Sequence, residues 1–79
     1  MSDAESKLEA RYSNHLEIGQ NVFEFLLDFG QLYDGPGKKP LIHTRIVTSP
    51  FYAKCFSGLL RESLRRYEED NGSIPPEEP

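Results

Sequence analysis

One segment of this sequence carries a helix signal at both of its ends, and it constrains the fold more than any other. Ser49 precedes Pro50, and a serine hydroxyl can accept a hydrogen bond from an unsatisfied amide in the first turn of a helix. Proline at the first helical position loses no needed N–H group, and its restricted φ suits the helix. Asn71-Gly72 supplies the left-handed residue at which helices commonly end. The sequence therefore predicts a helix over residues 50–71.

The predicted helix is amphipathic. Its apolar residues recur at spacings of one, three and four, as expected for a single stripe on one side of a helix. They are Tyr52, Ala53, Phe56, Leu59, Leu60, Leu64 and Tyr67. Gly58 lies inside the helix, where glycine costs about 1 kcal/mol relative to alanine, and this indicates close packing at that point.

Three segments that precede the helix have features of β-strands. Residues 12–21 alternate, with Leu16 and Ile18 on one face. Residues 22–33 place aromatic and apolar residues at every second position, with two acidic residues and Leu26 between them. Residues 41–48 are rich in β-branched side chains, which favour strands. A short helix is the competing interpretation of residues 22–33, because their apolar residues also fit a 3.6-residue period.

These elements predict an α+β fold. We expect a three-stranded antiparallel β-meander followed by one C-terminal amphipathic α-helix that packs on the sheet. Residues 11–72 form the single domain, between a disordered tail at residues 1–10 and a Pro/Glu-rich disordered tail at 73–79. A sheet covered on one face by one helix keeps its other face and both of its edges open.

A domain this small needs additional stabilisation. The core of a chain of 79 residues contributes about 3–5 kcal/mol, and small domains usually add disulfides, a metal or a partner chain. Cys55 is the only cysteine, and the two histidines do not form a spaced metal signature with it. We therefore expect no metal or cofactor and predict self-association, most simply as a homodimer. The aromatic candidates for its interface, together with the helix glycine, are Phe23, Phe25, Phe29, Phe51, Tyr52, Phe56 and Gly58.

The charges are arranged in three blocks. Residues 1–35 hold seven acidic and two basic side chains, residues 36–66 hold one acidic and seven basic, and residues 67–79 hold five acidic and none basic. The candidate partner-binding residues of the central block are Lys38, Lys39, Lys54, Arg61, Arg65 and Arg66. Three alternatives remain open for them: binding of nucleic acid, binding of an acidic protein surface, and charges that are solvated or paired with acids of the chain itself.

The sequence does not predict an enzyme. Glu24 and Asp28, four residues apart on a strand, would be about 13 Å from each other, too far to cooperate as an acid–base pair. Cys55 lacks an evident base, and His15 and His43 have no metal-site spacing with it. Pro36 interrupts the glycine-rich loop at residues 35–39, and a strand follows the loop, unlike a phosphate-binding loop. No catalytic residue is therefore assigned.

The chain also resembles a known family through four motifs. These are Tyr12-Ser13-Asn14, the aromatic segment Phe25 to Phe29, the step from Arg45 to Pro50 into the helix, and the ending formed by Tyr67-Glu68 and Gly72 to Ile74. In combination they resemble the bacterial domain-of-unknown-function 3467 family over residues 11–74. No activity defines that family. The resemblance implies a transcription-linked partner as one possibility, through relatives encoded beside RNA polymerase subunit genes.

The functional expectation is a small non-enzymatic protein-binding or assembly module that forms a homodimer. The alternative is a transcription-linked or nucleic-acid-binding regulator that uses the basic loop and the basic side of the helix. The sequence has no apolar run long enough to span a membrane and no signal-peptide pattern at residues 1–10. With a single cysteine, this predicts a cytoplasmic protein.

Overall fold

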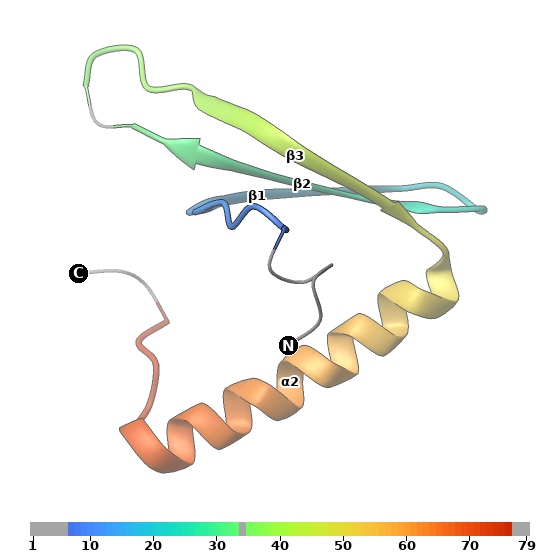
Figure 1. Ribbon diagram of the computed structural model, residues 1–79, viewed down its shortest axis with the longest axis vertical. Coiled ribbons are helices and arrows are strands. Elements are labelled where there is room, and N and C mark those ends of the chain that lie inside the picture. Colours follow the sequence, from blue (N-terminus) through green and yellow to red (C-terminus); the bar gives the residue numbers. More distant parts are fainter. Residues whose placement is uncertain (1–6, 34, 77–79) are drawn as a thin grey trace.

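The structure is a three-stranded sheet followed by one long helix (Figure 1). It is a computed structural model that describes residues 7–33 and 35–76. The elements are β1 (His15–Gln20), β2 (Phe25–Leu32), β3 (Pro40–Thr48) and α2 (Pro50–Asn71). The strands are antiparallel in the order β1-β2-β3, which confirms the α+β meander. Of the predicted disordered tails, residues 1–6 and 77–79 lie outside the described residues.

The helix begins and ends where its capping residues predict. The amide of Tyr52 donates to Ser49 Oγ over 3.2 Å, and Pro50 occupies the first turn. At the other end Gly72 has a φ of 87°, and its amide donates to the carbonyl of Glu68 over 3.0 Å. These interactions are local, so the sequence alone is sufficient to place both ends.

The segment at residues 22–33 is a strand, and its interpretation as a helix is wrong. The strand starts later than predicted, at Phe25, because residues 21–24 form a turn. Asn21 Oδ1 accepts hydrogen bonds from the amides of Phe23 and Glu24 over 2.8 and 2.9 Å. Asparagine is favoured in such turns because its side chain can bond to the backbone two residues on. Phe23 therefore belongs to the turn and not to the apolar face of β2.

The register of the strands gives the sheet one apolar face and a second, charged face that also carries Leu26 and Val47. Leu16 pairs with Phe29, and Leu27 lies between Ile18 and Ile46. On the opposite face Asp28 lies between Glu17 and Arg45. Since paired residues of adjacent strands project from the same face, the alternation predicted for β1 and β2 is confirmed.

A close approach between β2 and β3 depends on Gly30. The register shifts at this point, so that Phe29 pairs with Thr44 while Gly30 pairs with Ile42. A Cβ atom added to Gly30 would lie 2.3 Å from the carbonyl oxygen of Leu41 and 2.9 Å from Ile42 Cα. Gly30 is also buried. Its φ is not positive, so glycine is needed here for space and not for an unusual conformation.

The side chains of Ser13 and Asn14 hold the start of β1 against β2. Ser13 Oγ accepts from the amide of Gly30 over 3.1 Å and lies 2.9 Å from the carbonyl oxygens of Gly30 and His15. Asn14 Oδ1 accepts from the amide of Leu32 over 2.8 Å. Two residues of the Tyr-Ser-Asn motif thus satisfy backbone groups of the sheet, which gives this motif a structural role.

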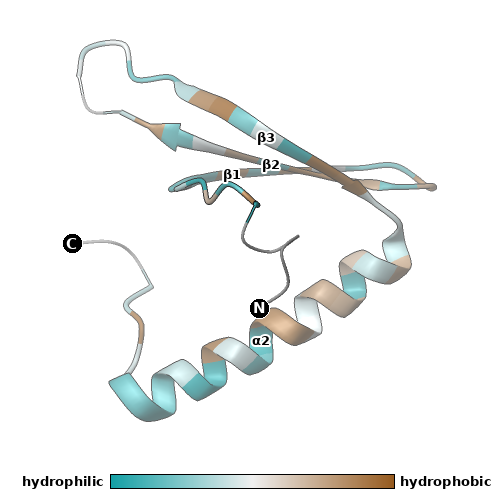
Figure 2. Cartoon of the chain, viewed as in Figure 1, coloured by the Kyte–Doolittle hydropathy of each residue, from teal (hydrophilic) through white to brown (hydrophobic). Residues whose placement is uncertain are grey.

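The helix lies opposite the apolar face of the sheet but does not close on it (Figures 1 and 2). Ala53 is half-buried, and every other residue of α2 is exposed. Among the described residues, Leu27 is the only buried apolar side chain, at 9% exposure. The predicted packing of the helix on the sheet is therefore incomplete in the single chain. Periodicity identifies which side of an element is apolar, but it contains no information on what covers that side.

The dimensions of the chain agree with this open arrangement. The radius of gyration is 15.4 Å, whereas a compact domain of this length has about 12 Å. The accessible surface is 7244 Å², whereas a compact monomer of this mass exposes about 4,900 Å². The chain thus exposes roughly 2,300 Å² more than a closed monomer. Segments outside helix and sheet, such as residues 7–13 and 72–76, contribute to this excess together with the open groove.

Candidate functional site

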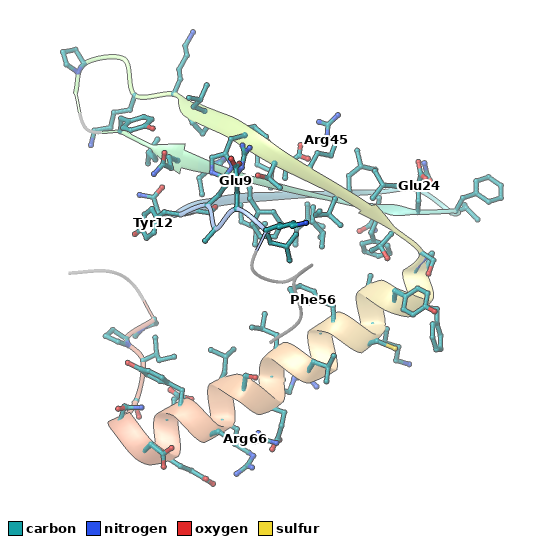
Figure 3. The ribbon with its side chains drawn as sticks, viewed as in Figure 1. Glu9, Tyr12, Glu24, Arg45, Phe56 and Arg66 are labelled. Atoms are coloured by element: carbon teal, nitrogen blue, oxygen red, sulfur yellow. The ribbon has the colours of Figure 1, made fainter. Side chains whose placement is uncertain are left out.

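A groove of about 440 Å³ lies between the sheet and the helix. Its first wall comes from β1 and β2 and its second from α2, and Phe56 lies on the side of α2 that faces the sheet (Figure 3). The lining residues are Leu16, Ile18, Phe25, Leu27, Ala53, Phe56, Ser57, Leu60, Arg61 and Leu64. The alternating apolar residues of two strands and the apolar stripe of the helix therefore form one site.

The groove continues toward the end of the helix. A second hollow of about 440 Å³ is lined by Leu60, Ser63, Leu64, Tyr67 and Ile74, so it shares Leu60 and Leu64 with the first. Ile74 is held near the helix because its amide donates to Glu68 Oε2 over 2.8 Å. The apolar surface thus extends along most of α2.

The lining of the groove is suited to the binding of apolar side chains. Ser57 and Arg61 are the only polar residues among those that line the first hollow. Small-molecule sites usually combine an apolar lining with several convergent polar groups that orient the ligand. This lining has no such arrangement, and its apolar side chains are accessible: Ile18 is 58%, Phe56 45% and Leu60 46% exposed.

The structure divides the predicted aromatic interface into two sets. Phe25 and Phe56 line the groove, and Phe29 shares the apolar face because it pairs with Leu16. The remaining four residues, Phe23, Phe51, Tyr52 and Gly58, do not line the groove. Four further residues of the groove, Leu16, Ile18, Leu60 and Leu64, were not predicted at an interface, although the periods of the strand and the helix mark all four as apolar-face residues.

The second set is exposed near the start of α2 and in the first turn of the sheet. Phe51 and Tyr52 are 68% and 63% exposed, and their rings meet edge to face with centroids 5.3 Å apart. Phe23, in the turn between β1 and β2, is 82% exposed. A Cβ atom added to Gly58 would meet nothing within 4 Å. Packing within the single chain therefore does not explain the glycine at position 58.

The predicted basic residues do not form one surface. Lys38 and Lys39 lie on the loop between β2 and β3, at the end of the hairpin remote from the start of α2, which carries Lys54 (Figure 1). Arg61 lines the groove.

The two arginines in the second half of the helix pair with its own acids. Arg65 bonds to Glu62 over 2.7 Å and also to Glu69, and Arg66 bonds to Glu62 over 3.3 Å. The Arg65 guanidinium, with a contribution from Arg66, holds the pKa of Glu62 below its usual value. Arg66 points away from the sheet (Figure 3). Of the three alternatives for the basic block, pairing within the chain accounts for Arg65 and Arg66.

The residues considered for metal binding are dispersed. His15 Nε2 lies 2.8 Å from Glu17 Oε2 on β1. On β3, His43 Nε2 lies 3.0 Å from the carbonyl oxygen of Tyr12. Cys55 is exposed on α2. In residues 7–33 and 35–76 there is no group of three side chains that could hold a metal ion.

The charged face of the sheet carries a bidentate ion pair. Arg45 Nε and its terminal nitrogen donate to the two carboxylate oxygens of Asp28, each over 2.8 Å. The Arg45 side chain extends away from α2 (Figure 3). Hydrogen bonding to Arg45 holds the pKa of Asp28 below its usual value. The pair joins β2 to β3 and marks this face as the one that remains in water.

This pair leads to a prediction on acid stability. The pKa of Asp28 is lower in the folded than in the unfolded chain. The contribution of the Asp28–Arg45 pair to the free energy of unfolding is therefore complete above about pH 4 and is lost as the pH falls further. We expect the urea midpoint of the wild type to fall more between pH 7 and pH 3 than that of Asp28→Asn. Glu62 titrates in both proteins, so the difference isolates Asp28. An equal fall of the urea midpoint in the two proteins would contradict the role given to the Asp28–Arg45 pair.

None of the helices in the described part of the chain is both long enough and apolar enough to cross a membrane.

The fold and the groove define a small β-β-β-α domain whose sheet and helix present an unclosed apolar surface. The model of one protein family matches residues 3–75, nearly the whole chain. The chain belongs to this family, which is described as protein of unknown function DUF3467. This confirms the resemblance found in the sequence motifs. No curated protein and no solved structure matches the chain.

Proposed function

We propose that this protein is a non-enzymatic protein-binding or assembly module that acts as a homodimer in the cytoplasm. The observation that carries the proposal is the apolar groove, whose walls come from the sheet and the helix and remain exposed in the single chain. An apolar surface that joins two layers of a domain is commonly a site for another polypeptide.

The energetics support this proposal. Full burial of a Leu, Ile or Phe side chain contributes about 1.5–3 kcal/mol, and the groove leaves Leu16, Ile18, Phe56, Leu60 and Leu64 between 42% and 58% exposed. With Leu27 as the only buried apolar side chain in the described part of the chain, one copy has little to offset the conformational entropy of folding. A partner that covers the groove would supply the missing burial.

The proposed homodimer implies that the mass and the thermal stability of the protein depend on its concentration. We expect light scattering to give twice the chain mass of 9.0 kDa at micromolar concentration. The thermal midpoint, followed by circular dichroism, should rise with each tenfold increase in concentration, since association stabilises the folded state by mass action. A 9.0 kDa species throughout the series, with a constant and high midpoint, would contradict the proposal.

The alternative of a nucleic-acid-binding regulator has weaker support. Glu62 and Glu69 already pair with Arg65 and Arg66, which reduces the positive charge that α2 offers to phosphates. A transcription-linked protein as the bound partner is compatible with the proposed module. Retention on DNA at low salt that is lost when Arg61, Arg65 and Arg66 are replaced by alanine would favour the regulator.

A further inference from the structure

The walls of the groove define what can occupy it. One wall is the apolar face of an antiparallel sheet and the other is the stripe of a helix of 22 residues. The element that commonly covers such a sheet face is an amphipathic helix. The occupant therefore needs an apolar helical surface about as long as α2 itself.

The first half of α2 is apolar on the side turned away from its own groove as well. Phe51, Tyr52 and Leu59 are 68%, 63% and 73% exposed, and none of them lines the groove. Cys55 and Gly58, which also lie outside the groove lining, add no charge, so that Lys54 is the one charged residue in the first half of the helix. A helix with large apolar side chains on opposite sides is one that other elements cover on more than one side. Closure of α2 on its own sheet would leave the three large side chains in water.

The amount of uncovered surface is large enough to contain the interface of an obligate dimer. Interfaces of obligate homodimers bury about 1,000–2,500 Å² on each partner, and this chain exposes roughly 2,300 Å² more than a compact monomer. The occupant must also be present whenever the chain is folded, because the single copy buries only Leu27 among the apolar side chains described. A second copy of the same chain meets both conditions.

From these observations we infer that helix α2 of a second copy occupies the groove, and that the exchange is reciprocal. This inference rests on the proposed function and specifies its partner and its geometry. In a two-fold dimer the same surface serves both protomers. Each α2 then contacts its own sheet on one side and the partner on the other, which accounts for the apolar residues on both sides of its first half.

Disulfide trapping tests this exchange directly. All variants carry Cys55→Ser, which removes the only native thiol. A tagged chain with Ile18→Cys on the sheet wall is mixed with an untagged chain that has Leu59→Cys or, in parallel, Leu60→Cys on the helix. The two chains are unfolded together, refolded and oxidised. We expect a covalent product with one chain of each kind on non-reducing gels, from at least one of the two helix positions.

The matched control replaces Ile18→Cys by Val22→Cys in the turn between β1 and β2, where Val22 is 85% exposed. This control should give at least tenfold less product. Circular dichroism must first show that each variant keeps the helix content of the parent, and the two helix positions allow for the failure of either one.

The possible outcomes separate the inference from the proposed function. One outcome is that the mixture gives no product, while a chain with both Ile18→Cys and Leu60→Cys forms an intrachain disulfide. This outcome shows that α2 closes on its own sheet, and it overturns the inference. A dimeric mass without any sheet-to-helix disulfide also overturns it but leaves the homodimer intact. A monomeric mass at every concentration overturns both.

Discussion

The substitution Gly30→Ala is expected to remove most of the folding stability of this protein. The added methyl group would lie 2.3 Å from the carbonyl oxygen of Leu41 and 2.9 Å from Ile42 Cα. Both atoms belong to the backbone of β3, so no side-chain rotation can relieve the contact. Overpacking of this kind costs about 3 kcal/mol, which is close to the whole stability of about 3–5 kcal/mol for a domain of this size.

The same substitution disturbs a second set of contacts. The amide and the carbonyl of Gly30 are both within hydrogen-bond distance of Ser13 Oγ, and the carbonyl accepts from the amide of Asn14 over 3.1 Å. A shift of β2 away from β3 would strain these bonds and expose buried polar groups, at about 1–3 kcal/mol for each group left unsatisfied.

Urea denaturation followed by circular dichroism measures this effect, with Gly19→Ala as the matched control. Gly19 lies on β1, and a Cβ atom there would meet nothing within 4 Å. Its φ is not positive, so Gly19→Ala should be neutral or stabilise by up to about 1 kcal/mol through the unfolded state. Similar midpoints for the two variants would refute the role given to Gly30.

A charge in the groove is the second change with a large expected effect. Leu60 lines both hollows of the groove and is 46% exposed in the single chain. If a partner covers it, Leu60→Glu places an unpaired carboxylate in an apolar interface, which costs about 3–5 kcal/mol. We expect the mass to fall to that of one chain, 9.0 kDa, together with a loss of helical signal, because the single chain has too small a core to remain folded.

The control for this prediction is Val22→Glu. It adds the same charge at a residue that is 85% exposed and lies in the turn between β1 and β2, outside the groove lining. It should keep the mass and the thermal midpoint of the wild type. A Leu60→Glu protein that retains both the dimeric mass and its helix content would show that the groove is not the interface.

The elements of this fold could be predicted because their signals are local. The cap at Ser49 and the stop at Gly72 act within one turn of the helix, and the alternation along β1 and β2 marks one face of the sheet. The start of β2 was predicted too early because the side chain of Asn21 forms a turn that removes Phe23 from the strand. This turn has its own sequence signal, because Asn21 follows Gly19 and Gln20 and precedes the apolar run, and both glycine and asparagine favour turns.

The sequence by itself established the helix, the order of the strands, the apolar face of β1 and β2, and membership of the family. It did not separate Tyr52 and Leu59 from the residues of α2 that line the groove. It also contained Gly30 and the Ser13-Asn14 pair, but their role became apparent only in the folded chain, where residues 17 positions apart meet. Only the tertiary structure showed that the stripe of α2 and the face of the sheet remain separated by a groove. Periodicity depends on neighbours within one element, whereas the closing of two layers depends on the balance between burial and chain entropy across the whole molecule. In this small chain that balance leaves a surface that a second chain can complete.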